Sequence, residues 1–152
     1  MGTKRNQIVY VDADSCPVKE EIISLCETYE CDVVFVCSYA HDLNAPAHIK
    51  IVQVDCHKEA VDLYILAAVK ETDVCVTQDY GLASLLLMKG VYVVSPRGHR
   101  YDEKTMDEML QSRYLSQKER RSGKKVRGGP KKFTAIERDR FKQNLASLLD
   151  GE

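Results

Sequence analysis

The fold is decided by residues 8–17, IVYVDADSCP, where a run of β-branched and aromatic residues ends abruptly in carboxylates. The first five residues predict a short buried strand, because Ile, Val and Tyr favour the pleated sheet. Ser15, Cys16 and Pro17 predict the opening of a helix, since proline is tolerated in a first helical turn. A strand, a carboxylate-rich turn and a helix in this order indicate the start of a βαβ unit.

The same alternation continues through the first two thirds of the chain. Further strands are predicted at 32–37, 49–54, 74–77 and 91–94, and further helices at 59–70 and 80–88. Strands separated by helices of about ten residues require parallel pairing, with helices on both faces of the sheet. We therefore predict an α/β fold of three layers, α/β/α, with a mostly parallel five-stranded sheet.

Length and composition indicate one globular domain. The 152 residues are 44% hydrophobic and 30% charged, which suffices for a buried core and excludes a disordered or collagen-like chain. We expect residues 1–114 to form the α/β core, 115–133 a basic flexible loop, and 134–150 a C-terminal helix packed on the core. Thr134 and Glu137 form the T-x-x-E pattern of a capping box at its start.

Targeting and cysteine usage indicate a cytoplasmic protein. No apolar run approaches the ~20 residues of a membrane helix, and the polar residues 1–7 do not resemble a secretory signal. The six cysteines are then expected to be reduced thiols that serve as small buried apolar side chains. Because no CxxC pair occurs, no zinc site is expected.

The net charge of −1 is the sum of two opposed regions. Residues 113–142, the basic segment, hold 12 Lys or Arg and three Asp or Glu, a net charge of +9, so the remainder carries −10. This asymmetry indicates a polyanionic partner, for which we expect nucleic acid and in particular RNA. The alternative is that the charge run is a solvated tail.

Two groups of basic residues are expected to contact the nucleic acid. The first follows the strand at 91–94, where an ordinary charged turn is the alternative, and the second belongs to the basic segment. They are Arg97 and Arg100, then Arg120, Arg121, Lys124, Lys125, Arg127, Lys131 and Lys132. Tyr114 and Phe133 flank the second group and could stack on bases.

Five carboxylates fall where the chain leaves a strand or enters the next helix. They are Asp12, Asp14, Glu59, Asp62 and Asp79. Ligands of open parallel sheets bind beyond the carboxyl ends of the strands, so these five can converge on one edge, whereas Asp32 and Asp73 precede their strands. A cluster of like charges requires a proton or a cation, and oxygen ligands suit Mg²⁺ or Mn²⁺. The alternative is that Asp14 and Asp79 only cap helices.

Three blocks of sequence resemble a known family. They are DADSCPV at 12–18, VTQD at 76–79 followed by LA at 82–83, and GP-x-x-FT at 129–134 followed by DRF at 139–141. In this order they resemble the YaiI/YqxD family of uncharacterised bacterial proteins, and the match covers nearly the whole chain. That family brings no established activity with it.

The YaiI/YqxD family is in turn similar to the PIN-like nuclease superfamily, whose three-layer domain gathers acidic residues around Mg²⁺ or Mn²⁺. Residues 62–68, DLYILAA, resemble the superfamily's D-x-x-I-x-A helix, and residues 77–79 resemble its T-x-D element. The resemblance implies that Asp12, Asp62 and Asp79 are catalytic and hold the metal.

The resemblance leaves supporting roles for other residues. Asp14 and Glu59 would lie behind the three aspartates or at a second ion, and Ser15, Cys16, Thr77 and Gln78 would line the pocket. The superfamily's additional acidic residue has no clear counterpart unless Glu20, Glu21 or Glu59 takes its place. Ser15 and Cys16 have no adjacent base, so neither is expected to be a nucleophile.

The expected activity is metal-assisted hydrolysis of phosphodiester bonds. One alternative is a non-catalytic RNA-binding or ribosome-associated module of the same fold. Another is a phosphatase of the haloacid dehalogenase type, because a strand followed by Asp12-x-Asp14 matches the first motif of that class. We rank the phosphatase last, because residues 76–79 lack the acidic pair that its chemistry uses.

Overall fold

Strand β1 (Ile8–Asp12) is the centre of the sheet and pairs in parallel with both of its neighbours. The computed structural model describes residues 7–38, 49–56, 59–102, 104, 106–107 and 133–150, and its strand order is β3-β2-β1-β4-β5-β6. The other strands are β2 (Asp32–Cys37), β3 (Lys50–Gln53), β4 (Val74–Val76), β5 (Tyr92–Val94) and β6 (Arg100–Tyr101). Asp12 is in register with Val36 of β2, and Val11 with Val76 of β4, so these three strands end at the same edge.

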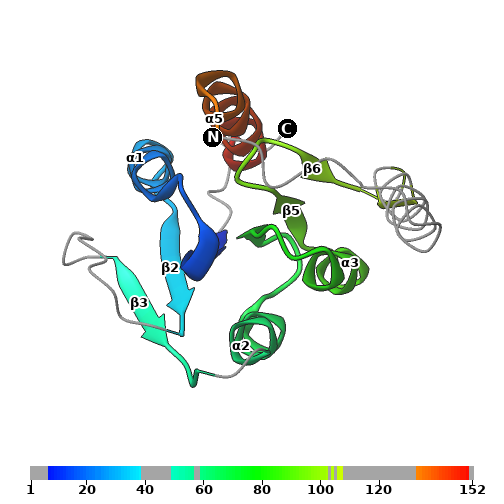
Figure 1. Ribbon diagram of the computed structural model, residues 1–152. Coiled ribbons are helices and arrows are strands. Elements are labelled where there is room, and N and C mark those ends of the chain that lie inside the picture. The colour runs from blue at the N-terminus through cyan, green and yellow to red at the C-terminus, as the bar shows by residue number, and fades with distance from the viewer. Residues whose placement is uncertain are drawn as a thin grey trace, which may run out of the picture.

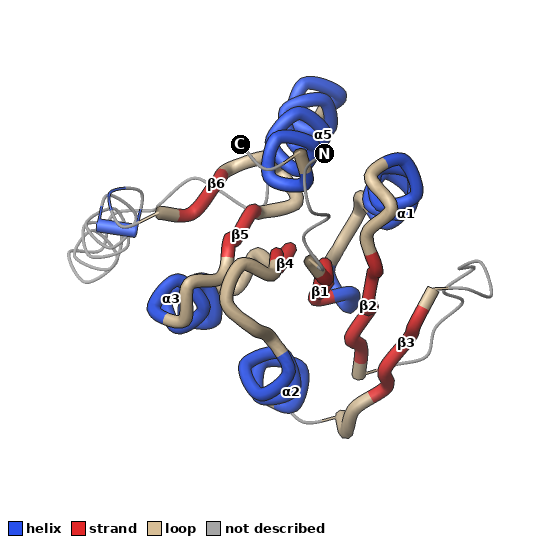
Figure 2. Tube along the Cα trace, turned by 180° about the vertical axis from the view of Figure 1, so that it is seen from behind, coloured by secondary structure: helices blue, strands red, loops and turns tan. Residues whose placement is uncertain are grey.

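The helices cover both faces of this sheet (Figures 1 and 2). One face is covered by α1 (Lys19–Thr28) and α5 (Ala135–Leu149), and the other by α2 (Ala60–Ala68) and α3 (Tyr80–Met88). Two hydrophobic clusters fill the two interfaces, with Phe35 and Phe141 in the first, and Val36 and Ile65 in the second. The architecture is the predicted three-layer α/β/α fold.

The position of strand β2 between the two helical layers explains why its sequence is continuously apolar. Val33 and Phe35 belong to the cluster under α1 and α5, whereas Val34 and Val36 belong to the cluster under α2 and α3. A parallel strand covered on both faces has no polar side, so alternation disappears from its sequence.

The sequence pattern predicts five strands, but the described residues form six. Strand β6 pairs antiparallel with β5, and the turn between them is closed by the Ser95 N–H, which donates to the His99 carbonyl at 2.8 Å. A strand of two residues is too short to have a periodicity, so tertiary pairing alone defines it.

The predicted start of the first helix, at Ser15 to Pro17, is wrong, because the helix begins about one turn later. A 3₁₀ turn, η1 (Ala13–Ser15), follows β1, and α1 begins only at Lys19. Cys16 is extended, with φ −98° and ψ 114°, because the residue before a proline is disfavoured in the α region. The bounds of β1, β2 and α3 are those predicted.

Helix α5 begins with the predicted capping box of Thr134 and Glu137. Of the basic loop predicted at 115–133, residues 115–132 lie outside the described residues, as does most of 103–114. Within the described part of the chain, no helix is long and apolar enough to cross a membrane.

The turn after β5 fixes α5 against the sheet. Gly98 has φ +91°, and a Cβ at this position would lie 2.7 Å from the backbone nitrogen of Phe141. The Asn144 amide donates to the Gly98 carbonyl, and the Arg97 guanidinium pairs with Glu137 at 2.8 Å. A backbone-to-backbone approach this close requires glycine.

We expect Gly98→Ala to lower the free energy of unfolding by more than about 1 kcal/mol, because the new methyl group meets backbone and the positive φ penalises alanine. Urea denaturation followed by circular dichroism measures the change. Gly81→Ala in α3 is the matched control, since its Cβ would lie 3.4 Å from the nearest heavy atom, a carboxylate oxygen of Asp79. Equal stability of the two variants would contradict the role given to Gly98.

Candidate functional site

The strand order reverses between β1 and β4. The chain runs from β1 outward through β2 to β3, then returns to β4 on the other side of β1 and continues outward to β5 and β6. In doubly wound sheets, ligands bind at this switch point, beyond the carboxyl ends of the strands. Asp12 ends β1, and Thr77 to Asp79 follow β4, so both reach the switch point.

Thr77 joins the two strand ends. Its side chain is buried, and its hydroxyl donates to Asp12 Oδ2 at 3.1 Å while it accepts from the Asp79 N–H at 2.9 Å. A hydroxyl can donate and accept through one oxygen atom. Thr77 therefore orients the Asp12 carboxylate and places the backbone of Asp79 at the same time.

Asp79 serves both as a helix cap and as a member of the carboxylate cluster. Its Oδ1 accepts from the Leu82 N–H at 2.9 Å, which satisfies one of the free donors at the start of α3. Asp79 therefore caps α3, but it does not only cap the helix. Asp79 also lies beside Asp62 of α2 and contributes to the raised pKa of that carboxyl group.

Asp62 has the most strongly altered acidity of the cluster. Its pKa is raised to about 6, chiefly by burial and then by the negative charges of Asp79, Asp12 and Glu59. Asp12 also has a raised pKa, through burial and the charges of Asp14 and Asp79, against the lowering effect of the Thr77 hydrogen bond. Burial and the neighbouring negative charges therefore both favour the neutral form of these two carboxyl groups.

A cavity of about 420 Å³ opens beside these carboxylates, between α2 and α3. One group of lining residues is acidic and comprises Glu59, Asp62 and Asp79. The other is apolar and comprises Leu63, Leu66, Leu82 and Leu85, with Gly81 among them. Leu63 and Leu85 are 58% and 49% exposed, so their side chains are accessible from solvent.

The apolar side of this cavity was not predicted from the sequence. Its signal was the run Leu85-Leu86-Leu87, because one buried helix face does not use three consecutive apolar positions. Leu86 is fully buried whereas Leu85 faces the cavity.

Asp14 lies next to the cluster but has a partner of its own. Its Oδ1 and Oδ2 lie 3.1 Å from the Ser38 N–H, and its Oδ2 also accepts from the Ser38 hydroxyl at 2.5 Å. These bonds fasten η1 to the end of β2. Asp14 acts on Asp12 through its charge.

The predicted pocket-lining residues lie in different environments. Thr77 is part of the site, and Gln78 is exposed beside it. Cys16 is buried in the cluster under α1 and α5, and burial raises the pKa of its thiol to about 11, so the thiol stays neutral. Ser15 ends η1, and its side chain lies outside the described part of the structure.

The carboxylate expected at the opposite end of the sheet does lie there. Asp73 is 3% exposed, and its Oδ1 and Oδ2 accept from the N–H groups of Ile8 at 3.1 Å and Lys70 at 2.9 Å. Backbone donors fully occupy this carboxylate, so its role is to join the turn before β4 to the start of β1.

The basic candidates that are described, Arg97 and Arg100, are not among the residues that line the carboxylate cavity. Arg97 pairs with Glu137 and lies over the Phe133 ring, 5.9 Å from its centroid, and Arg138 lies over the same ring at 5.0 Å. Arg138 also pairs with Glu21 of α1. Arg97 and Phe133 therefore hold α5 in place.

Arg100 lies on β6 beside a second cavity. The remaining basic candidates, with Tyr114, lie outside the described residues: Arg120, Arg121, Lys124, Lys125, Arg127, Lys131 and Lys132.

The donor set at the switch point fits a hard divalent cation. Its groups are carboxylate oxygens, which suit Mg²⁺ or Mn²⁺. In the ranges that the structure describes, no three His, Cys, Asp or Glu side chains are placed to hold one ion directly. Mg²⁺ commonly uses one or two carboxylates and completes its coordination with water, so Asp12, Asp62 and Asp79 would hold such an ion partly through water.

The fold and the site define a doubly wound α/β protein with a carboxylate cavity at its switch point. The chain belongs to the uncharacterised YaiI/YqxD family, whose model matches residues 10–151. A UPF0178 protein of Shouchella clausii is 58% identical, covering 95% of this chain and 94% of its own, and one of Halalkalibacterium halodurans is 52% identical, covering 93% and 89%.

Among solved structures, a crystal structure of a mutant of Rae1 (YacP) from Bacillus subtilis matches 95% of this chain and 98% of its own. Its sequence is 14% identical, and the TM-score is 0.43.

The raised pKa of Asp62 predicts how stability depends on pH in the absence of metal. From about pH 4 to 6 the folded state retains a proton that the unfolded state has released, so the wild type loses stability as the pH rises. Asp62→Asn should remove this loss and exceed the wild type by on the order of 1 kcal/mol at pH 7.5, allowing for solvent screening. Near pH 4 the two should be equally stable.

Urea denaturation in EDTA at several pH values checks this expectation. Asp139→Asn, exposed on α5, is the control and should follow the wild-type pH dependence. A pH-independent difference between Asp62→Asn and the wild type would show that Asp62 is not protonated in the cluster.

Proposed function

We propose that this protein is a Mg²⁺- or Mn²⁺-dependent nuclease that hydrolyses phosphodiester bonds in RNA. The observation that carries the proposal is the set of three aspartates at the switch point, which Thr77 organises and in which Asp12 and Asp62 have raised pKa values. The resemblance to PIN-like nucleases assigns catalysis to the same three residues, Asp12, Asp62 and Asp79.

The charge balance of the cavity supports a cation as the missing component. No Lys or Arg is among the described residues that line it, whereas Glu59, Asp62 and Asp79 are. The charges of Asp79 and Asp12 contribute to the raised pKa of Asp62. A divalent ion would offset this repulsion and favour the ionised form of all three aspartates.

A bound ion would supply a water of lowered pKa and positive charge beside the scissile phosphate. The residues of the chain do the positioning. The Thr77 hydroxyl holds Asp12 Oδ2, and the Leu82 N–H holds Asp79 Oδ1, so both carboxylates are oriented before any ligand arrives. Leucine side chains give the other side of the cavity an apolar surface.

The basic segment supports a polyanionic substrate. Its net charge of +9 offsets the −10 of the rest of the chain, whose carboxylates would otherwise repel a phosphate backbone. Binding through such a segment depends strongly on salt concentration, because phosphate contacts release counterions.

Cleavage of a labelled single-stranded RNA in the presence of Mn²⁺ tests the proposal. We expect slow cleavage by the wild type, none in EDTA, and a loss of two or more orders of magnitude in Asp12→Asn and Asp79→Asn, since both remove charge at the reacting centre. Asp139→Asn should cleave like the wild type. Equal cleavage by all four proteins would overturn the nuclease assignment.

Mn²⁺ binding, followed by calorimetry, gives a readout that does not depend on turnover. The wild type should bind Mn²⁺ with release of protons at pH 6, because the proton on Asp62 must leave. Asp62→Asn should bind more weakly and without this release. Identical binding by both proteins would show that Asp62 is not a ligand.

A non-catalytic RNA-binding or ribosome-associated module is the second candidate. It is favoured by the observation that no three described side chains are placed to hold one ion directly. Salt-dependent RNA binding that survives Asp12→Asn, without cleavage by the wild type, would establish this module in place of the nuclease.

A further inference from the structure

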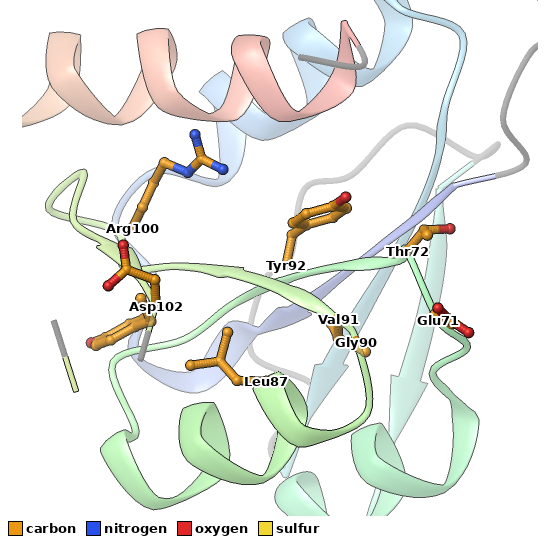
Figure 3. Close-up of a pocket in the computed structure, with 9 residues that line it drawn as sticks. Glu71, Thr72, Leu87, Gly90, Val91, Tyr92, Arg100 and Asp102 are labelled. Atoms are coloured by element: carbon orange, nitrogen blue, oxygen red, sulfur yellow. The ribbon is translucent and has the colours of Figure 1, made fainter. Parts of the chain in front are cut away.

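A second cavity lies at the opposite edge of the sheet from the aspartates. Its volume is about 650 Å³, within the usual range for small-ligand pockets. Its lining comes from the turn before β4, from the amino end of β5, and from β6 together with Asp102, which follows β6 (Figure 3). None of its lining residues also lines the carboxylate cavity.

Tyr92 and Arg100 face the same side of the sheet. Arg100 is in register with Val94 of β5, and Tyr92 lies two residues before Val94, so all three side chains share one face. Residues in this diagonal relation are within reach of one another when the side chains are long or aromatic. Figure 3 shows both side chains on the side toward α5, with Leu87 on the other side of the strand.

This pair is accessible to a ligand. Tyr92 is 36% exposed, and Arg100 is also exposed. An aromatic ring with a neighbouring guanidinium offers a stacking surface and an anion partner together. The two side chains therefore favour a ligand that combines a flat ring with a negative group.

The floor of the cavity is rigid and strained. Thr72 has φ +73°, a left-handed conformation that is an outlier for a β-branched residue. Its N–H donates to the Gly90 carbonyl at 3.0 Å, and its carbonyl accepts from the buried Gln7 amide at 3.0 Å. Strain that the surrounding structure maintains in this way is typical of ligand-binding positions.

Two carboxylates complete the lining. Glu71 packs over Gly90, where an added Cβ would lie 2.9 Å from Glu71 Cγ, and Asp102 follows β6. Carboxylates accept hydrogen bonds from N–H groups, such as the amino and imino groups of a purine. The cavity thus combines a stacking ring, one cation and carboxylate acceptors.

We propose that this cavity binds a purine nucleoside phosphate. The base stacks on Tyr92 with its N–H groups toward Glu71 or Asp102, and the phosphate pairs with Arg100. The ligand is either a free nucleotide or one nucleotide of an RNA strand. This inference does not rest on the proposed nuclease activity, because it uses none of the aspartates at the switch point.

Calorimetric titration of the full-length protein in EDTA tests the proposal, with adenosine monophosphate, guanosine monophosphate and a purine-rich RNA pentanucleotide as probes. We expect saturable binding of at least one probe, weakened at least about tenfold in Tyr92→Leu and in Arg100→Gln. Lys142→Gln loses the same charge at an exposed position of α5 and should bind like the wild type. Circular dichroism confirms that each variant is folded.

The probes separate the two sources of the ligand. Binding of a mononucleotide identifies a free nucleotide, and binding of the pentanucleotide alone identifies a strand. No binding of any probe, or binding that Tyr92→Leu and Arg100→Gln leave unchanged, would overturn the proposal. Asp79→Asn should bind the probes normally, so failure of the nuclease proposal and failure of this one give different results.

Discussion

The hydrogen bonds of the Thr77 hydroxyl are the interaction on which the rest of the site depends. One oxygen atom donates to Asp12 and accepts from the backbone of Asp79, so it links the end of β1 to the start of α3. A valine of the same shape would leave the Asp12 carboxylate and the Asp79 N–H without these partners, at a cost of about 1–3 kcal/mol for each buried group left unpaired. The site therefore requires a hydroxyl here as well as a buried residue of this size.

The two ends of the sheet use carboxylates in different ways. At the amino end, Asp73 is buried and accepts from two backbone N–H groups, so its charge is stabilised within the fold. At the carboxyl end, Asp12, Asp62 and Asp79 are brought together without a neighbouring cation among the described lining residues. The first arrangement stabilises the structure. The second retains repulsion that a ligand can relieve, which is the property expected of a functional site.

The sequence predicts the elements whose signals are local. β1, β2 and α3 have the predicted bounds, because continuous apolar runs and the spacing of apolar residues specify them without reference to the rest of the chain. The grouping of Asp62 with Asp79 was also predictable, since the carboxyl ends of parallel strands meet at one edge. The extended backbone of Cys16 has a local cause as well, in Pro17.

Features that depend on distant partners could not be predicted in this way. Asp14 fastens to Ser38, 24 residues away, and Arg97 pairs with Glu137, 40 residues away. Strand β6 is defined only by its antiparallel pairing with β5. In each case the sequence identifies a side chain or strand but does not show which distant residue it contacts.

The contacts of Arg97 and Arg138 place Phe133 at a defined edge of the sheet. Arg97 leaves the carboxyl end of β5, and Arg138 pairs with Glu21 in the first turn of α1, which follows the carboxyl end of β1. Both guanidinium groups lie over Phe133, the described residue that follows Lys132 in the basic segment. Phe133 is thereby anchored at the same edge of the sheet as the aspartates.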